Sequence, residues 1–179
     1  MRIARIAMTA AAVLQCAVGV TSTVPAAHAG PIVTTATVLK IVDGDTIDVK
    51  DDQRGRLRIR LLGIDTPETK KPGYTVGCWG AQATDFATST LLGQRVAVTP
   101  DPTQGTYDRY GRTLAYLVKA DGWNYSVEAA REGTAKSYVY HNKPVTEYPV
   151  ISAAEQEAIA AKRGLWGAPC FGITDSVPG

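Results

Sequence analysis

The chain has 179 residues, of which 45% are hydrophobic and 20% charged, and its formal net charge is +2. A chain of this length suits a single domain with a sizeable core. The net charge comes entirely from Arg2 and Arg5, so the rest of the chain is formally neutral. Overall basicity is therefore excluded as a basis for binding nucleic acid, and any site for a polyanion must be a local patch.

The N-terminal segment has the three-part pattern of a secretory signal peptide. Two arginines precede an apolar run over residues 6–24, and a small-x-small cleavage motif follows at residues 27–29. A membrane anchor is the alternative, but the run is rich in Ala and Thr, and no basic stop-transfer cluster follows it. We expect a signal peptide over residues 1–29, cleavage after Ala29, secretion without stable membrane association, and one domain over residues 30–179.

The first elements expected after this segment are three strands joined by tight turns. Residues 35–42 are largely β-branched, and an alternating pattern resumes over residues 46–49 after an Asp-Gly-Asp turn. Residues 57–64 alternate apolar with basic side chains before becoming continuously apolar. A period of two residues predicts strands. Three consecutive strands with short connections form a meander, whose neighbouring strand ends lie close together.

The rest of the chain predicts three helices and two further strands. Helical spacing followed by glycine predicts helices that end before Gly93, Gly133 and Gly164. The expected elements are a helix over residues 79–92, strands over 94–99 and 113–119, a short helix capped by Asn124 or Ser126, and a helix over 153–163 capped by Ser152. Residues 69–77 are predicted to form an exposed basic loop, and residues 138–148 an aromatic loop.

Two cysteines remain once the predicted signal peptide, which contains Cys16, is set aside. An even pair in an exported chain favours a disulfide between Cys78 and Cys170. Two buried free thiols are the alternative. His141 is the only histidine in residues 30–179, and two cysteines with one histidine argue against a zinc site.

Four acidic residues follow or flank adjacent strands of the predicted meander. They are Asp43, Asp45, Asp65 and Glu68. A single acid at a strand end usually just forms a turn. Several carboxylates brought together repel one another and need compensation. A hard cation such as Ca²⁺, which prefers oxygen ligands, is the natural compensation, and Asp45 and Asp65 are the expected direct ligands.

Arginines accompany the same acids along the chain. Arg60 begins the stretch that contains Asp65, and Arg109 and Arg112 lie in a later polar segment. Simple salt bridges are one interpretation. A guanidinium also matches phosphate with two parallel hydrogen bonds, and two arginines with a divalent ion can stabilise the charge of a phosphoryl transition state. Glu68 has the right chemistry to orient or deprotonate an attacking water.

Three motifs together resemble the signatures of the staphylococcal nuclease, or thermonuclease, family. They are Asp-Gly-Asp-Thr-Ile at residues 43–47, Arg-Leu-Leu-Gly-Ile-Asp-Thr-Pro-Glu at 60–68, and Asp-Arg-Tyr-Gly-Arg-Thr-Leu-Ala-Tyr at 108–116. The resemblance extends over about residues 35–166. It implies an α+β fold, namely a five-stranded OB-fold barrel with three α-helices.

The resemblance also implies roles for individual residues. The catalytic residues would be Arg60, Glu68 and Arg112, and the calcium ligands would be Asp45, Asp65 and the carbonyl of Thr66, with Asp43 near the metal through water. Substrate contacts would come from Arg109, Tyr110, Tyr138 and Tyr140. Stacking of tyrosine rings on bases is independent of sequence. Core packing is the alternative for Tyr138 and Tyr140.

The activity implied is calcium-dependent hydrolysis of DNA and RNA, single-stranded or locally melted, to 3′-phosphate products by a secreted monomer. A non-catalytic OB-fold module that only binds nucleic acid or protein is one rival, and a structural surface protein is another. The chain departs from the family pattern in two ways. The expected disulfide would tie the first helix to the C-terminal tail, and the loop after Glu68 is less basic apart from Lys70 and Lys71.

Overall fold

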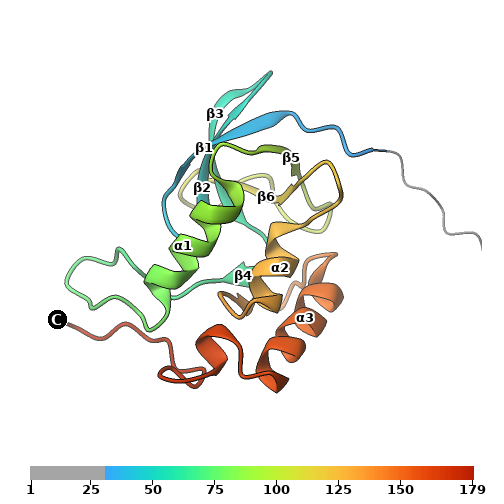
Figure 1. Cartoon of the computed structure of the whole chain (residues 1–179). Coiled ribbons are helices and arrows are strands. Elements are labelled where there is room, and N and C mark those ends of the chain that lie inside the picture. Colours follow the sequence, from blue (N-terminus) through green and yellow to red (C-terminus); the bar gives the residue numbers. More distant parts are fainter. Residues whose placement is uncertain (1–30) are drawn as a thin grey trace, which may run out of the picture.

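Five strands close into a barrel in a computed structural model that describes residues 31–179 (Figure 1). The order around the barrel is β1-β2-β3-β6-β5. β3 and β6 are parallel, whereas the other neighbouring pairs are antiparallel. The strands are β1 (Ala36–Ile41), β2 (Thr46–Asp51), β3 (Gly55–Leu61), β5 (Arg95–Thr99) and β6 (Thr113–Val118). The predicted OB-fold barrel is confirmed. The predicted signal peptide lies outside the described residues.

The expected meander is made by β1, β2 and β3. Ile47 of β2 pairs with Ile59 of β3, and Val49 pairs with Leu57. Ile47, Val49 and Ile59 are fully buried in the core. Because the side chains of a strand alternate between its two faces, this register sends one face into the barrel. It also brings the Asp43–Asp45 turn beside the end of β3.

Three helices pack outside the barrel. α1 (Gly80–Leu91) contacts β1, and α2 (Tyr125–Arg131) packs against α3 (Tyr148–Ala160) (Figure 1). Asn124 caps α2 by accepting a hydrogen bond from the amide of Ser126, as anticipated. Gly93 follows the C-cap of α1 and has a φ of +76°, a left-handed conformation that favours glycine and terminates the helix.

The predicted start of the last helix was wrong. α3 begins at Tyr148, so Ser152 lies inside the helix and does not cap it. Pro149 lies in the first turn, where its fixed φ suits a helix and its missing amide hydrogen has no intrahelical partner to lose. Ile151 is fully buried, so the core also requires this first turn to be helical.

A second, two-stranded sheet joins the strand end after β3 to the aromatic loop. It pairs β4 (Ile64–Asp65) with β7 (Lys136–Ser137). The amide of Tyr138 then donates to the carbonyl of Gly63 at 2.9 Å. This small sheet, which the sequence pattern did not predict, places the start of the aromatic loop beside the turn between β3 and β4.

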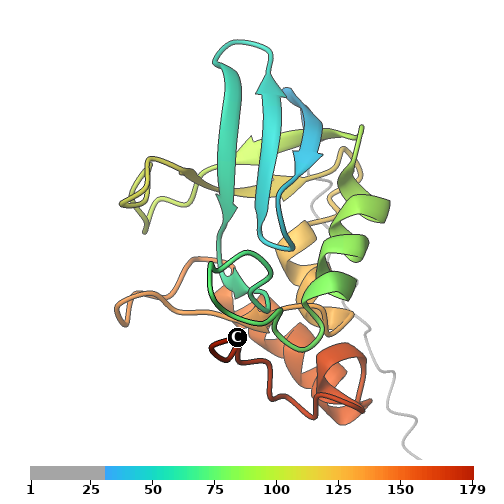
Figure 2. The same ribbon diagram turned by 90° about the vertical axis from the view of Figure 1, so that its left-hand side faces the viewer.

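The C-terminal segment returns to the loop that precedes α1. Cys78 and Cys170 form the predicted disulfide, with their Cα atoms 5.8 Å apart. Figure 2 shows the last residues running beside the loop between β4 and α1. Within residues 31–179, no helix is both long enough and apolar enough to span a membrane.

Candidate active site

The predicted acidic residues meet at one end of the barrel. Asp43, Asp45, Asp65 and Glu68 all line a single cavity of about 330 Å³. Arg60, Arg112 and Thr66 line the same cavity. The four acids share this cavity because the turn between β1 and β2 abuts the ends of β3 and β4, as expected for neighbouring strand ends.

Arg60 is held between two of these carboxylates. Its Nη1 atom lies 3.0 Å from Asp45 Oδ2, and its Nη2 atom lies 2.8 Å from Asp65 Oδ1. Nη1 also donates to the carbonyls of Leu61 and Ile64, at 3.2 and 3.1 Å. With 15% of its side chain exposed, the guanidinium is fixed at the cavity wall. Such fixed donors stabilise charge without having to reorganise.

Asp45 links the first acidic turn to the second. Its Oδ2 atom accepts from the amide and the hydroxyl of Thr66, at 3.0 and 3.1 Å. Its Oδ1 atom accepts from the hydroxyl of Thr46 at 3.0 Å. These bonds fix the Thr66 backbone beside the Asp45 carboxylate.

The first residues of α2 hydrogen-bond to the β1–β2 turn and to the end of β3. The buried Tyr125 hydroxyl donates to the carbonyl of Gly44 at 2.7 Å, and the Ser126 hydroxyl donates to the carbonyl of Leu62 at 2.9 Å. Gly44 packs tightly, since a Cβ there would lie 2.8 Å from Cγ2 of Thr66. The acidic turns are thus anchored to a helix.

Arg112 approaches the same turn from the other side. Its Nε atom donates to Asp108 Oδ2 at 2.6 Å, and its Nη1 atom donates to the Thr46 hydroxyl at 3.3 Å. Asp108 also accepts from the backbone amide of Arg112 at 2.9 Å. The two arginines therefore reach the cavity from separate strands, Arg60 at the end of β3 and Arg112 just before β6.

The local electrostatics favour a cation. Burial, followed by the negative charge of Asp45, raises the pKa of Asp43 to about 6. Burial also raises the pKa of Asp65, although Arg60 opposes the rise. Raised carboxyl pKa values mean that the anionic forms lack full compensation.

The donor set fits a hard metal ion. Within residues 31–179, no three Asp, Glu, His or Cys side chains are grouped to hold a metal by themselves. Asp45 and Asp65, together with the Thr66 carbonyl, supply only oxygen atoms. Calcium and magnesium accept carboxylate and carbonyl oxygens and complete their coordination with water. The residues present therefore suit such an ion and would not suit a zinc site made of nitrogen and sulfur ligands.

Glu68 lies at the rim of the cavity and is exposed to solvent. Its Oε1 atom accepts a hydrogen bond of 2.6 Å from the backbone amide of Lys70. The loop that follows Glu68 thus aims its carboxylate. A solvent-exposed carboxylate in a cavity that two arginines also line can receive a proton from a water molecule.

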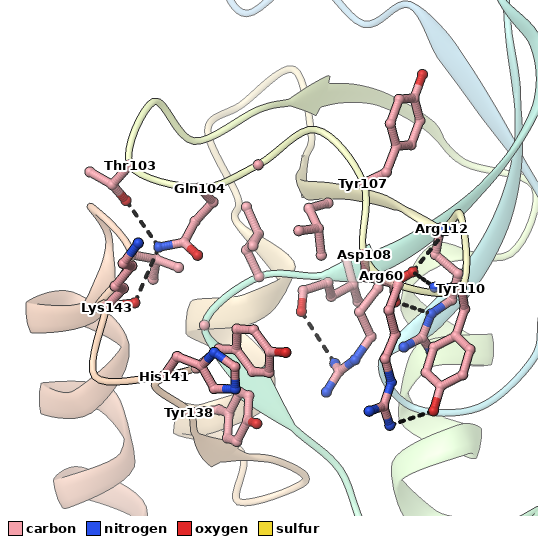
Figure 3. A pocket seen from close by; sticks show the side chains of 18 residues that line it. Arg60, Thr103, Gln104, Tyr107, Asp108, Tyr110, Arg112, Tyr138, His141 and Lys143 are labelled. Carbon is pink, nitrogen blue, oxygen red and sulfur yellow. Dashed lines mark hydrogen bonds and ion pairs between the residues drawn. The ribbon is translucent and has the colours of Figure 1, made fainter.

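A second cavity of about 650 Å³ adjoins the first, since Arg60 and Arg112 line both. Arg109, Tyr110, Tyr138 and Tyr140, the four residues predicted to contact substrate, all line it. Figure 3 shows Tyr138 and His141 across the cavity from Tyr110 and Arg112.

Core packing was the wrong alternative for the two tyrosines of the aromatic loop. Tyr138 is 40% exposed and Tyr140 is 52% exposed. Tyr110, at 66% exposure, accepts a 2.5 Å hydrogen bond from Arg109, whose guanidinium lies 4.7 Å from the ring centroid. The three tyrosines and Arg109 are therefore solvent-exposed at this cavity.

The sequence argument missed other residues of this cavity. His141 stacks on Tyr140 with ring centroids 4.0 Å apart, and Tyr107 adds another exposed ring. Gln104 donates to the carbonyl of Lys143 at 3.2 Å across the cavity (Figure 3). The one available signal was His141, the lone histidine of residues 30–179, because a single exposed imidazole in an aromatic loop suits a binding surface better than a metal site.

Comparisons with known proteins identify relatives of this chain. A family model described as "Staphylococcal nuclease homologue" matches residues 58–168. The Thermonuclease of Staphylococcus intermedius is 38% identical over 130 residues, which cover 72% of this chain and 74% of that protein. The Thermonuclease of Staphylococcus hyicus is 36% identical over 130 residues, covering 72% and 73%. An "Uncharacterized endonuclease" of Escherichia coli is 37% identical over 129 residues, covering 72% and 74%.

These similarities cover most of each chain, and the fold and the grouped motifs agree with them. The chain belongs to the staphylococcal nuclease family. The predicted enzyme class, a nuclease of the phosphodiesterase type, is confirmed.

Proposed function

We propose that the chain is a calcium-dependent nuclease that hydrolyses phosphodiester bonds of single-stranded or locally melted DNA and RNA to 3′-phosphate products. The main support is the convergence of Arg60, Arg112 and Glu68 with Asp45 and Asp65 on one cavity. A second cavity, lined with tyrosines, adjoins it and shares both arginines. Phosphate and bases therefore have adjacent places to bind.

The proposed chemistry follows from what each side chain can do. Arg60 and Arg112 bind the non-bridging oxygens of the scissile phosphate and stabilise the added negative charge. Glu68 takes a proton from the water whose oxygen forms the new bond to phosphorus. The bond from phosphorus to the 5′-oxygen breaks, the 5′-oxygen takes a proton from solvent, and phosphate remains on the 3′-oxygen.

Calcium is the proposed ion, with Asp45, Asp65 and the Thr66 carbonyl as ligands and Asp43 acting through water. Bound there, a divalent cation would supply positive charge that stabilises the phosphoryl transition state. The all-oxygen donors and the raised pKa values of Asp43 and Asp65 support this assignment.

Substrate binding is proposed to use the larger cavity. Arg109 would contact a neighbouring phosphate, and Tyr110, Tyr138 and Tyr140 would stack on bases or contact phosphate. Base–aromatic stacking contributes about 1–3 kcal/mol per base regardless of sequence. The open side chains described above support a nuclease with little base preference.

The assay for this proposal combines substrate, ion and product. Purified protein is incubated with single-stranded DNA and with RNA, each with calcium and with a chelator. We expect calcium-stimulated cleavage of both polymers and products that gain a 5′-hydroxyl and a 3′-phosphate. Intact polymers in calcium, or undiminished cleavage in chelator, would contradict the proposal.

Export is a separate proposal. Residues 1–29 have the pattern of a signal peptide, and the Cys78–Cys170 disulfide is typical of proteins in oxidising compartments. We propose that the domain over residues 30–179 is released as a secreted monomer. Mass spectrometry of the protein from culture medium should find an N-terminus at Gly30, and a chain retained in the cell with Met1 present would contradict export.

A further inference from the structure

We propose that residues 173–179, the C-terminal strap, are a positioning element for Glu68. The strap acts through residues 69–77, the rim loop, and is anchored beside the Cys78–Cys170 disulfide. The proposal rests on the proposed role of Glu68 in the nuclease reaction. It goes beyond that role by assigning the positioning of Glu68 to a segment outside the three motifs.

The last three residues of the strap pair with residues 73–75 of the rim loop. The amide of Thr75 donates to the carbonyl of Val177 at 2.8 Å, and the amide of Val177 donates to the Thr75 hydroxyl at 3.1 Å. The amide of Gly179 donates to the carbonyl of Gly73 at 3.0 Å. Figure 2 shows the two segments side by side. The strap and the rim loop therefore form a small antiparallel pair.

The same pair packs directly on the backbone of Glu68. The amide of Gly77 donates to the carbonyl of Glu68 at 2.7 Å. A Cβ on Gly77 would lie 2.6 Å from the Thr174 carbonyl oxygen and 3.2 Å from the Glu68 nitrogen. Strap, rim loop and Glu68 thus meet where only glycine fits.

The rim loop also aims the Glu68 side chain. Oε1 of Glu68 accepts its 2.6 Å hydrogen bond from the amide of Lys70, at the start of the loop. A shift of the loop therefore moves this donor and the carboxylate with it. Thr174, Asp175 and Ser176 of the strap line the same cavity as Glu68, so the strap forms one wall of the catalytic cavity.

The strap needs an anchor because a short pair of strands is only marginally stable in water on its own. The Cys78–Cys170 bridge joins the end of the rim loop to the start of the C-terminal segment. Lys136 adds a second attachment, since its Nζ atom donates to the carbonyl of Gly172 at 2.8 Å. Tethering keeps the two segments at high effective concentration, which favours their pairing.

The test compares the whole exported protein with a variant that ends at Gly172. Hydrogen exchange of the Thr75 and Gly77 amides reports on the rim loop, and kcat and KM are measured on single-stranded DNA in calcium. We expect faster exchange of both amides and a fall in kcat of about tenfold, because a catalytic group that is misplaced by about 1 Å can cost a hundredfold. KM should stay within about twofold, because the cavity proposed to bind bases does not contact the strap.

Two controls separate loss of position from loss of folding. Val150→Ala changes an exposed side chain on α3, outside both segments, and should leave exchange and kcat unchanged. The amide of Leu61 in β3, which donates to the Asp45 carbonyl, should exchange at the wild-type rate in every variant. A double variant, Cys78→Ser with Cys170→Ser, keeps the strap without its anchor and should also speed exchange of the Thr75 and Gly77 amides.

Unchanged exchange of the rim-loop amides, or wild-type kcat in the shortened chain, would overturn the proposal. An inactive wild-type protein would instead contradict the proposed function. The exchange rates would then still show whether the strap orders the rim loop.

Discussion

Asp101 links residues 101–111 to the aromatic loop, residues 138–148, and both segments flank the larger cavity. Asp101→Asn should weaken this link. The buried carboxylate accepts from the amide and hydroxyl of Thr103, at 2.8 and 2.6 Å, and from the Tyr116 hydroxyl at 2.6 Å. It also accepts from the amide and hydroxyl of Thr146, at 2.7 and 3.0 Å. One charged group thus ties the loop that carries Arg112 to the aromatic loop.

Asp101→Asn should lower the free energy of unfolding because it removes hydrogen-bond acceptors. Asparagine keeps one carbonyl oxygen, but its amide would face the amide of Thr146, and that donor would lose its partner. A buried unsatisfied donor costs about 1–3 kcal/mol, and charge-assisted hydrogen bonds are roughly twice as strong as neutral ones. We expect a loss of about 3 kcal/mol in the free energy of unfolding, with a rise in KM for single-stranded DNA.

The effect should depend on pH. Burial raises the pKa of Asp101, but the hydrogen bonds from Thr103 and Tyr116 outweigh it, so the pKa lies below its ordinary value. A carboxyl whose pKa is lower in the folded state stabilises the fold above its unfolded pKa, about 4, and loses that contribution as pH falls. The difference between wild type and variant should therefore shrink below about pH 4.

Urea unfolding followed by circular dichroism measures this difference. Asp85→Asn, at an exposed position on α1, is the matched control and should change stability by less than about 0.5 kcal/mol. A loss below about 1 kcal/mol at pH 7 for Asp101→Asn, or a difference that is constant with pH, would show that the Asp101 charge does not hold the two loops together.

Three further substitutions test other parts of the structure. A hydrogen bond from Arg58 lowers the pKa of Asp48 to about 2. Asp48→Asn should therefore remove about 1–2 kcal/mol of stability that is present above pH 4. Identical acid-unfolding curves for wild type and variant would contradict this. Tyr125→Phe removes the 2.7 Å hydrogen bond to the Gly44 carbonyl. The free energy of unfolding in urea should fall by about 1–2 kcal/mol, and kcat should also fall. An unchanged urea midpoint would show that this bond does not stabilise the fold. Gly44→Ala places a Cβ 2.8 Å from Cγ2 of Thr66 and should lower the free energy of unfolding by about 1–3 kcal/mol. It should also raise the calcium concentration needed for half-maximal cleavage. A wild-type calcium dependence would show that the turn adapts freely.

The barrel and the acidic cluster could be predicted because both follow from local patterns. Period-two alternation marked the meander, and short turns between its strands forced their ends together. Asp43, Asp45, Asp65 and Glu68 therefore had to share one end of the barrel, as they do.

Other features depend on contacts between distant segments and leave little local trace. β4 and β7 have only two residues each, too few to show a periodicity. The start of α3 depends on burial of Ile151, and the position of Ser152 alone suggested a false cap. Asp101 reads as an ordinary turn residue, because its partner Thr146 is 45 positions away.

The arginines show the same limit at the site itself. The chemistry of Arg60 and Arg112 suits phosphate, but simple salt bridges were the alternative interpretation. The structure contains both features, since Arg60 pairs with Asp45 and Asp65 while lining the cavity. Sequence alone could not assign this arrangement, because the contacts require three separate chain segments.

The most direct test of the proposed catalytic centre is the kcat of Glu68→Gln on single-stranded DNA in calcium. The substitution keeps the size of the side chain and removes the proposed base, so kcat should fall by at least about a hundredfold with unchanged thermal unfolding. Glu132→Gln, at an exposed position after α2, should retain wild-type kcat. A Glu68→Gln variant that keeps kcat within about twofold of wild type would contradict the assignment of this cavity as the catalytic centre.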